Sequence, residues 1–364
     1  MAKPGYKSQS NSSNRRKNKA RSGTGKPTFQ KSEPPPQERQ PRIAPEFVLP
    51  PRMNWDGQRL VERTGVVLKT APSPDYELID SGNGRKLERY GNRLIDRPEG
   101  QAIWQPSAPQ SLWQSVDAVF TGDTDEEGVG RWRFPKGEFG ETWELAFDRI
   151  PFWGRFMSFR HVGVFPEQAA HWHGLQDAIR HAKQVRSSPI KMLNLFGYTG
   201  LASLVGARAG AEVTHVDASK KAIGWARENQ QLAGLTDKPI RWICDDAVKF
   251  CAREVRRGNS YDIILLDPPA YGRGPKGEVW QLFDHLPYMM DLVRQLQSAN
   301  PLLTVLTSYA IRASSFALHE ITQEVMAGLD GEIETGELIL QQREGERLLS
   351  TSMFSRYIGK GCKL

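Results

Sequence analysis

Short apolar runs alternate with amphipathic segments along the second half of the chain. The apolar runs predict buried strands at Lys191–Leu195, Glu212–Val216, Ile240–Cys244, Tyr261–Leu266 and Leu302–Thr307. The segments between and after them predict helices over Leu201–Ala209, Ser219 to Gly234, Cys244 to Gly258, Val279–Gln297 and Ser314–Leu329. Strand-like stretches follow at Glu332–Gln341 and Thr351–Ile358. This alternation predicts an α/β fold, a parallel sheet with helices on both faces.

Residues 46–160 have a different pattern, with short apolar runs separated by turn-forming residues. Asn83-Gly84 lies between the runs Tyr76–Asp80 and Leu87–Tyr90, and both of its residues tolerate a positive φ, which favours a tight hairpin. Tryptophan is concentrated in this half of the chain. We therefore predict a small β-rich accessory domain, whose aromatic side chains either form its core or stack on nucleic-acid bases.

Residues 1–45 are rich in Ser, Asn, Gly, Pro, Lys and Arg and hold almost no apolar residues, which predicts a disordered tail. Their eleven Lys and Arg against Glu33 and Glu38 give the tail a charge of +9. Because the whole chain carries +7, the remaining 319 residues carry −2. The tail is interpreted as a tether for phosphates, as a solubilising segment, or as a transit peptide, which the missing apolar face disfavours.

Composition excludes several classes of protein. Among the 364 residues no run approaches the roughly 18 apolar residues of a membrane helix. Cys244, Cys251 and Cys362 match neither a disulfide scaffold nor a zinc signature. No signal peptide is recognised, so a cytoplasmic setting is expected, without a membrane or a metal as partner.

Three predicted strands end in residues suited to a nucleoside. The first runs into a glycine turn that differs from the dinucleotide fingerprint and contains Asn194, Phe196, Gly197, Thr199 and Gly200. Glycines let a ligand approach the backbone, and the helix that follows offers free N–H donors. The second strand ends at Asp217, where an acid is placed to accept ribose hydroxyls, and the third at Asp245-Asp246, where an acid meets an adenine amino group. Each is ordinary alone, but together they indicate a nucleoside site.

The fourth strand ends in Asp267-Pro268-Pro269-Ala270-Tyr271-Gly272. Two prolines stiffen the backbone and remove N–H donors, which leaves carbonyls and the Asp267 carboxylate to accept hydrogen bonds from an amino group. Tyr271 is placed to stack on a flat ring. The loop Gly272–Gly277 holds three glycines together with Arg273 and Lys276. It is either a mobile phosphate-binding loop or a plain connection.

As a set, these motifs resemble the class I S-adenosylmethionine-dependent methyltransferases. The resemblance is closest to the bacterial 23S ribosomal RNA methyltransferases that act on cytosine C5 or guanine N7, and it covers about residues 160–364. It rests on Phe196–Gly200, on Asp267–Tyr271 and on Gly163–Gln168, which is similar to a segment that closes over the cofactor. The fold it implies is a Rossmann-like methyltransferase domain over 161–364, after the accessory domain and the tail.

The resemblance also implies roles for individual residues. Gly197, Thr199 and Gly200 would line the methionine end of S-adenosylmethionine, and Gln168 is a further candidate for cofactor contact. Asp217 would hold the ribose, and Asp245 or Asp246 the adenine. Asp267 and the Pro268 carbonyl would position the acceptor, with Tyr271 against its ring. The implied partner is RNA, specifically 23S ribosomal RNA; the oligomeric state stays open.

One departure from the family bears on the acceptor atom. Cytosine C5 needs a cysteine that adds at C6, and members that modify C5 place it just after the fifth strand. The corresponding residues here, Thr307-Ser308-Tyr309-Ala310, include none, and a serine hydroxyl is a much weaker nucleophile. A nitrogen or oxygen acceptor is therefore expected. The alternatives are a methyltransferase that acts on proteins or small molecules and an inactive RNA-binding protein. An NAD-linked oxidoreductase is disfavoured by the segments Phe196–Gly200 and Asp267–Tyr271.

Overall fold

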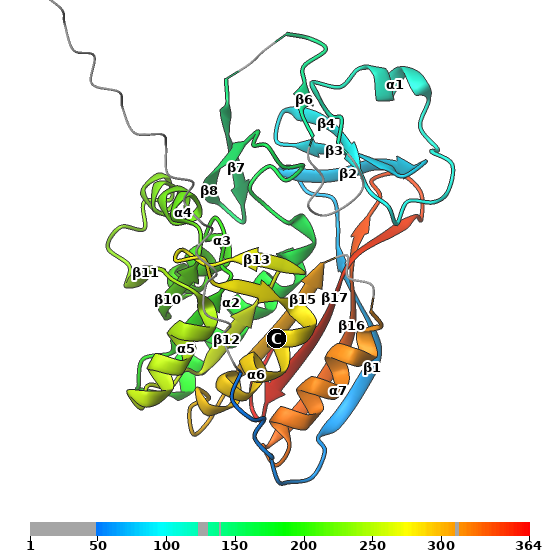
Figure 1. Cartoon of the computed structure of the whole chain (residues 1–364). Coiled ribbons are helices and arrows are strands. Elements are labelled where there is room, and N and C mark those ends of the chain that lie inside the picture. Colours follow the sequence, from blue (N-terminus) through cyan, green and yellow to red (C-terminus); the bar gives the residue numbers. More distant parts are fainter. Residues whose placement is uncertain (1–48, 123–129, 138–139, 310–312) are drawn as a thin grey trace, which may run out of the picture. The chain divides into compact units, whose positions relative to one another are not determined.

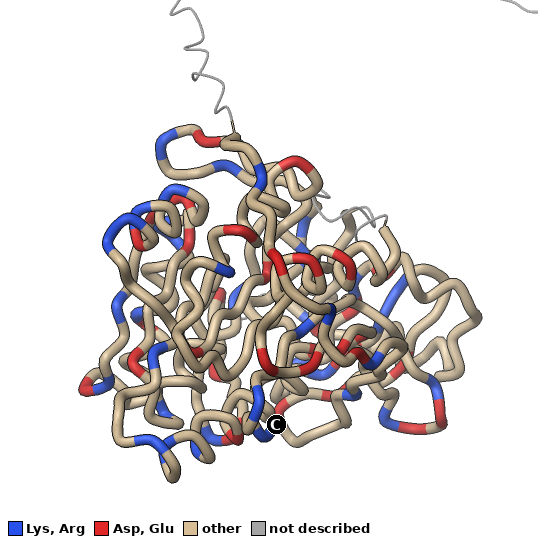
Figure 2. The backbone as a smooth tube through the Cα atoms, turned by 90° about the horizontal axis from the view of Figure 1, so that it is seen from below, with Lys and Arg blue, Asp and Glu red and all other residues tan. Residues whose placement is uncertain are grey.

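The computed structural model describes residues 49–122, 130–137, 140–309 and 313–364, so the predicted tail over 1–45 lies outside the described residues. All of the described residues fall within one compact unit. In these ranges no helix has the length and apolar character needed to cross a bilayer. Lys and Arg positions are interspersed with Asp and Glu positions along the backbone (Figure 2).

An eight-stranded sheet forms the centre of the molecule (Figure 1). Its order across the sheet is β1 (Val61–Thr70), β16 (Gly331–Gln341), β17 (Leu348–Gly359), β15 (Leu303–Tyr309), β12 (Ile263–Leu266), β9 (Lys191–Leu195), β10 (Glu212–Asp217) and β11 (Ile240–Cys244). The predicted strands are all present, with small shifts at their ends. Because β12, β9, β10 and β15 run parallel, their carboxyl ends meet at one edge of the sheet.

The predicted parallel sheet is corrected at one strand, β17. β17 pairs antiparallel with both β15 and β16. Only residues 342–347 join β16 to β17, and so short a connection permits an antiparallel neighbour but not the crossover that a parallel one requires. The sheet is therefore mixed.

Helices cover both faces of this sheet and enclose two cores. One core contains side chains of α2 (Ala169–Val185) and α3 (Leu201–Ala209). The other contains those of α5 (Ala247–Arg256), α6 (Leu282–Gln295) and α7 (Ser315–Met326). The Ser219 hydroxyl caps α4 (Lys220–Leu232) by accepting a hydrogen bond from the Ala222 amide.

The helix predicted over Val279–Gln297 is corrected at its start. Its first residues form the strand β14 (Val279–Gln281), which pairs antiparallel with β13 (Tyr271–Arg273), and α6 begins only at Leu282. The indole of Trp280 donates to the Pro269 carbonyl at 2.7 Å. This pairing with a distant segment overrides the local helical preference.

Two smaller sheets come from the first half of the chain. The five-stranded sheet contains β2 (Tyr76–Gly82), β3 (Arg85–Tyr90), β4 (Arg93–Pro98), β5 (Ala118–Phe120) and β6 (Trp132–Arg133). β7 (Thr142–Phe147) and β8 (Ile150–Arg155) form a separate hairpin, and the short helices α1 (Gln110–Gln114) and η1 (Pro166–Gln168) complete the set. As predicted, Asn83 and Gly84 form a tight turn, with φ of 52° and 72°.

Several aromatic residues of this region pack on one another. The ring of Phe156 lies 4.6 Å from Trp143 and 4.8 Å from Trp132, which favours the core interpretation over base stacking for these rings. β1 lies within the predicted accessory domain in sequence but pairs with β16 in the large sheet. The division of the chain at residue 160 stays a prediction.

Candidate functional site

The glycine turn after β9 has an unusual backbone. Phe196 and Tyr198 have φ of 56° and 51°, in a region that side-chain-bearing residues rarely adopt, and Gly200 has a φ of 83°. The Thr199 hydroxyl donates to the Gly163 carbonyl at 2.7 Å. These contacts join the turn to the segment that precedes α2, and backbone conformations of this strained kind cluster at functional sites.

A buried polar chain supports the base of this turn. The Asn194 amide donates to the Ser203 hydroxyl at 2.9 Å, which in turn lies 3.0 Å from Nδ1 of His215. Burial lowers the pKa of His215 to about 3, so its ring is neutral. A Cβ added to Gly197 would lie 2.4 Å from Cε1 of His215. Only glycine therefore fits at this point of the turn.

The predicted acids at the ends of β10 and β11 have different surroundings. Asp217 accepts backbone N–H groups from Tyr198 at 2.8 Å and Ser219 at 2.7 Å. Burial raises the pKa of Asp217, and these two hydrogen bonds oppose the rise. Asp246 caps α5 by accepting from the Lys249 amide, whereas Asp245 forms an ion pair with Arg253.

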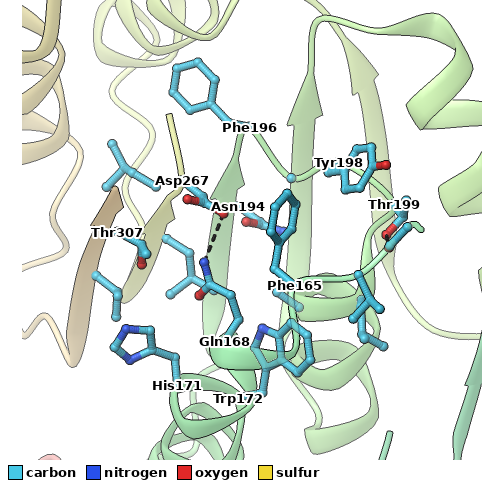
Figure 3. Close-up of a pocket in the computed structure, with 18 residues that line it drawn as sticks. Phe165, Gln168, His171, Trp172, Asn194, Phe196, Tyr198, Thr199, Asp267 and Thr307 are labelled. Atoms are coloured by element: carbon cyan, nitrogen blue, oxygen red, sulfur yellow. Dashed lines mark hydrogen bonds between the residues drawn. The ribbon is translucent and has the colours of Figure 1, made fainter. Parts of the chain in front are cut away.

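The corner after β12 is held by two side chains. Nε2 of Gln168 donates to Oδ2 of Asp267 at 3.0 Å, the hydrogen bond drawn in Figure 3. The Pro269 carbonyl is occupied by the indole of Trp280. Of the two carbonyls in this corner, that of Pro268 is the candidate to accept from a ligand. Tyr271 is 39% exposed on the strand β13.

Two neighbouring cavities open on these residues. The first, which we call the Asn194 cavity, has a volume of about 70 Å³ and is lined by Gln168, Asn194, Gly197, Thr199 and Asp267 among others (Figure 3). The second, the Asp217 cavity, has about 350 Å³ and is lined by Asp217, Ser219, Asp246, Asp267 and Pro268 among others. Both share Phe165, Phe196, Tyr198 and Asp267. Most of the sequence-predicted residues therefore converge, but Gly200, Asp245 and Tyr271 line neither cavity.

An aromatic wall in the lining of the Asp217 cavity was not predicted. The ring of Phe165 lies 4.6 Å from His161, 5.8 Å from Tyr198 and 6.0 Å from Tyr309. Burial raises the pKa of Tyr309 to about 12 and lowers that of His161 well below its usual value, so both rings are neutral near pH 7. A neutral aromatic wall suits the face of a planar ligand.

A buried charge cluster joins the small sheet to this wall. Lys86 pairs with Glu99 at 3.0 Å, and the Tyr309 hydroxyl donates to Glu99 at 3.3 Å. Burial alone would raise the pKa of Glu88, but the charges of Arg97 and Lys86 outweigh it and hold that pKa at about 2. Buried ion pairs resist the loss of either partner. The small sheet thus fixes the position of Tyr309 at the carboxyl end of β15.

The chain is similar to known proteins in sequence and in fold. The model of a family described as conserved hypothetical protein 95 matches residues 178–286. A SAM-dependent methyltransferase from Agrobacterium tumefaciens is 55% identical to the chain. The match covers 84% of this chain and 97% of the Agrobacterium protein, and the two structures superimpose with a TM-score of 0.81. The chain belongs to the S-adenosylmethionine-dependent methyltransferases. It is an enzyme of this class, and S-adenosylmethionine is its cofactor, as the sequence resemblance predicted.

More distant structures have the same fold as this methyltransferase. A protein described as a SAM-dependent methyltransferase from Streptococcus mutans is 14% identical over 78% of this chain and 75% of that one, with a TM-score of 0.57. The predicted Rossmann-like fold is therefore confirmed. In the part of the methyltransferase that the structure describes, no three His, Cys, Asp or Glu side chains gather as metal ligands.

The residues of the two cavities fit S-adenosylmethionine by their chemistry. The Asp217 cavity offers the carboxylates of Asp217 and Asp246 and the rings of Phe196 and Tyr198, which suit hydroxyl groups and a purine. The smaller Asn194 cavity offers the amides of Gln168 and Asn194. Asp267 borders both cavities and so lies at their junction.

Proposed function

We propose that the methyltransferase transfers a methyl group to a nitrogen of a base in RNA, with 23S ribosomal RNA as its substrate. The observation that carries this proposal is the Asp217 cavity, whose lining combines the Asp267–Pro268 corner with the aromatic wall. Such a site suits a flat ring that bears an amino group.

The cofactor is proposed to lie across the carboxyl ends of β9, β10 and β11. Asp217 would accept the ribose hydroxyls, and Asp246 the adenine amino group, because both line the larger cavity. Asn194, Gly197 and Thr199 would surround the methionine end in the smaller one, with Gln168 beside them. Phe196 borders both cavities. Gly200 lines neither cavity and would contribute through the shape of the turn, in which it precedes α3 with a left-handed backbone. Asp245 is the weaker candidate for adenine because Arg253 already pairs with it.

The acceptor is proposed to lie against Asp267. Its carboxylate would accept a hydrogen bond from the amino group, while the Pro268 carbonyl accepts a second one. These contacts would direct the nitrogen lone pair at the methyl carbon, so that the N–C bond forms as the S–C bond breaks. The surplus proton of the amino group would pass to the Asp267 carboxylate that already accepts its hydrogen bond, and from there to solvent when the product leaves. Catalysis is then mainly alignment in a site that excludes water, because the sulfonium is already a strong electrophile.

The described cysteines give no support for C5 chemistry. Ser308, in the position where C5 enzymes place their cysteine, is buried in β15. Cys244 is exposed at the end of β11, and burial raises the pKa of its thiol. Burial likewise raises the pKa of Cys362 to about 11. Neither lines the two cavities. We expect Cys244→Ser to retain full activity; loss of transfer in that variant would restore the C5 hypothesis.

Support for RNA comes from charge and from the aromatic wall. The basic tail suits a polyanion, although the charge of −2 on the rest of the chain leaves room for a protein or small-molecule substrate. The test is transfer of tritiated methyl from S-adenosylmethionine to total RNA and to total protein of a strain that lacks the gene. Mass spectrometry of ribosomal RNA nucleosides from that strain should show one missing N-methylated nucleoside. Label found only in protein would refute the proposal.

A further inference from the structure

We propose that the rim of the Asp217 cavity binds the single-stranded RNA on either side of the target nucleotide. In this assignment Phe159 and Tyr271 stack on neighbouring bases and Arg273 contacts a phosphate. The inference rests on the proposed function, and it gives Tyr271 a role outside the cavity instead of against the acceptor ring.

The hairpin β13–β14 forms one side of the rim. Residues two apart on a strand share a face, so Tyr271 and Arg273 lie together, and the guanidinium carbon of Arg273 is 6.0 Å from the centre of the Tyr271 ring. Both are exposed, whereas Trp280, which pairs with Gly272 across the hairpin, is buried against Phe196. Trp280 therefore anchors the hairpin, and Arg273 borders the cavity itself.

Phe159 forms the other side of the rim. Its ring is 57% exposed although it lines the same cavity as Arg273. Its carbonyl accepts a hydrogen bond from the indole of Trp132 at 3.2 Å, which holds this part of the backbone against β6. An exposed aromatic ring at the mouth of a functional cavity offers a face on which a base can stack.

The charge of the hairpin favours a phosphate over a carboxylate-rich or neutral partner. In the described part of the chain Arg273 makes no ion pair, and the side chain of Lys276 makes none either. The nearby carboxylate, Glu278, is neutralised by Lys249 at 2.7 Å. An unpaired guanidinium beside an aromatic ring matches the backbone and base of one nucleotide.

Single-stranded RNA is the occupant that these features fit. A base can reach the Asp267 end of this cavity, beside the cofactor nucleoside proposed at Asp217 and Asp246, only after leaving its stack. Its neighbours then lose a stacking partner, and exposed rings at the cavity mouth replace it. A protein substrate would gain little from two separated rings and a single guanidinium.

The experiment measures binding of a fluorescein-labelled, single-stranded RNA of mixed sequence to the full chain in the presence of S-adenosylhomocysteine. We expect Phe159→Ala and Tyr271→Ala each to weaken binding about tenfold, as loss of one stacked base does. Arg273→Ala should weaken it and reduce the slope of log K against log salt by about 0.7, the value for one phosphate on a single strand. Arg273→Lys should recover most of the salt slope.

The chain offers matched controls. Phe316 on α7 is 56% exposed and lines neither cavity, and Arg256 at the end of α5 is exposed and makes no ion pair with the described residues. Phe316→Ala and Arg256→Ala should leave RNA binding unchanged, and calorimetry should show unchanged S-adenosylhomocysteine affinity in every variant. If the wild type binds RNA and the rim variants bind it equally well, this inference is refuted and the proposed function stands. If the wild type binds no RNA and labels only protein, the proposed function fails and the inference with it.

Discussion

Replacement of Asp267 by asparagine tests the acceptor corner directly. In the structure Oδ2 of Asp267 accepts from Gln168 at 3.0 Å. An asparagine would turn its carbonyl oxygen toward that Gln168 donor and its NH2 group toward the acceptor, where donor would then face donor. The variant loses a charge-assisted hydrogen bond to the amino group, worth about 1.5–3 kcal/mol. Because about 1.4 kcal/mol corresponds to a factor of ten, kcat should fall roughly 10- to 150-fold.

The assay is transfer of tritiated methyl to ribosomal RNA from a strain that lacks the gene, with cofactor affinity measured by calorimetry. Gln168→Ala should lower kcat about tenfold because Asp267 loses its orienting partner. The double variant should lose less than the product of the two single effects, since both changes act on one hydrogen bond. Asp177→Asn, an exposed carboxylate on α2, is the control. Wild-type kcat in Asp267→Asn would refute the role assigned to Asp267.

Three further predictions concern the cofactor site and its support. Asp217→Asn should weaken S-adenosylmethionine binding at least about tenfold by calorimetry; equal affinity would contradict the ribose assignment. Gly197→Ala should cost about 1–3 kcal/mol in urea unfolding, because its Cβ would lie 2.4 Å from His215, whereas Gly224→Ala, with no atom within 4 Å, should cost nothing. His171 and His215, whose pKa values burial lowers from 6.5 to about 3, stay neutral in the fold while the unfolded chain takes up protons. Stability should therefore fall by about 2 kcal/mol for each between pH 8 and pH 5; a constant unfolding free energy over that range would contradict this.

The elements of the second half were predictable because their signals are local. The strands at Lys191–Leu195 and Ile240–Cys244 and the helix at Leu201–Ala209 have the predicted bounds. Apolar runs and terminal residues such as glycine specify such segments without reference to the rest of the chain. Val279–Gln281 was mistaken for helix because its strand pairing with Tyr271–Arg273 depends on a partner outside the local window.

Some residues of the candidate site could likewise be predicted from local sequence, and others could not. The convergence of Asp217, Asp246 and Asp267 on one cavity could be predicted because each lies at the end of a strand, and parallel strands bring their carboxyl ends to one edge. His161, Phe165 and Tyr309 carry no comparable signal. Their rings meet only after two separate segments have packed together, so no spacing in the sequence records their proximity.

The sequence by itself determined the α/β alternation, the acids at the strand ends and the motifs Phe196–Gly200 and Asp267–Tyr271. The spacing of apolar residues and the residues that end a strand are properties of neighbouring positions in the chain. Only the tertiary structure decided that β17 runs antiparallel, that β1 joins the large sheet, and that Tyr271 is exposed on β13 and lines neither cavity. Each of these depends on which distant surfaces bury one another, and burial is a property of the whole packed chain.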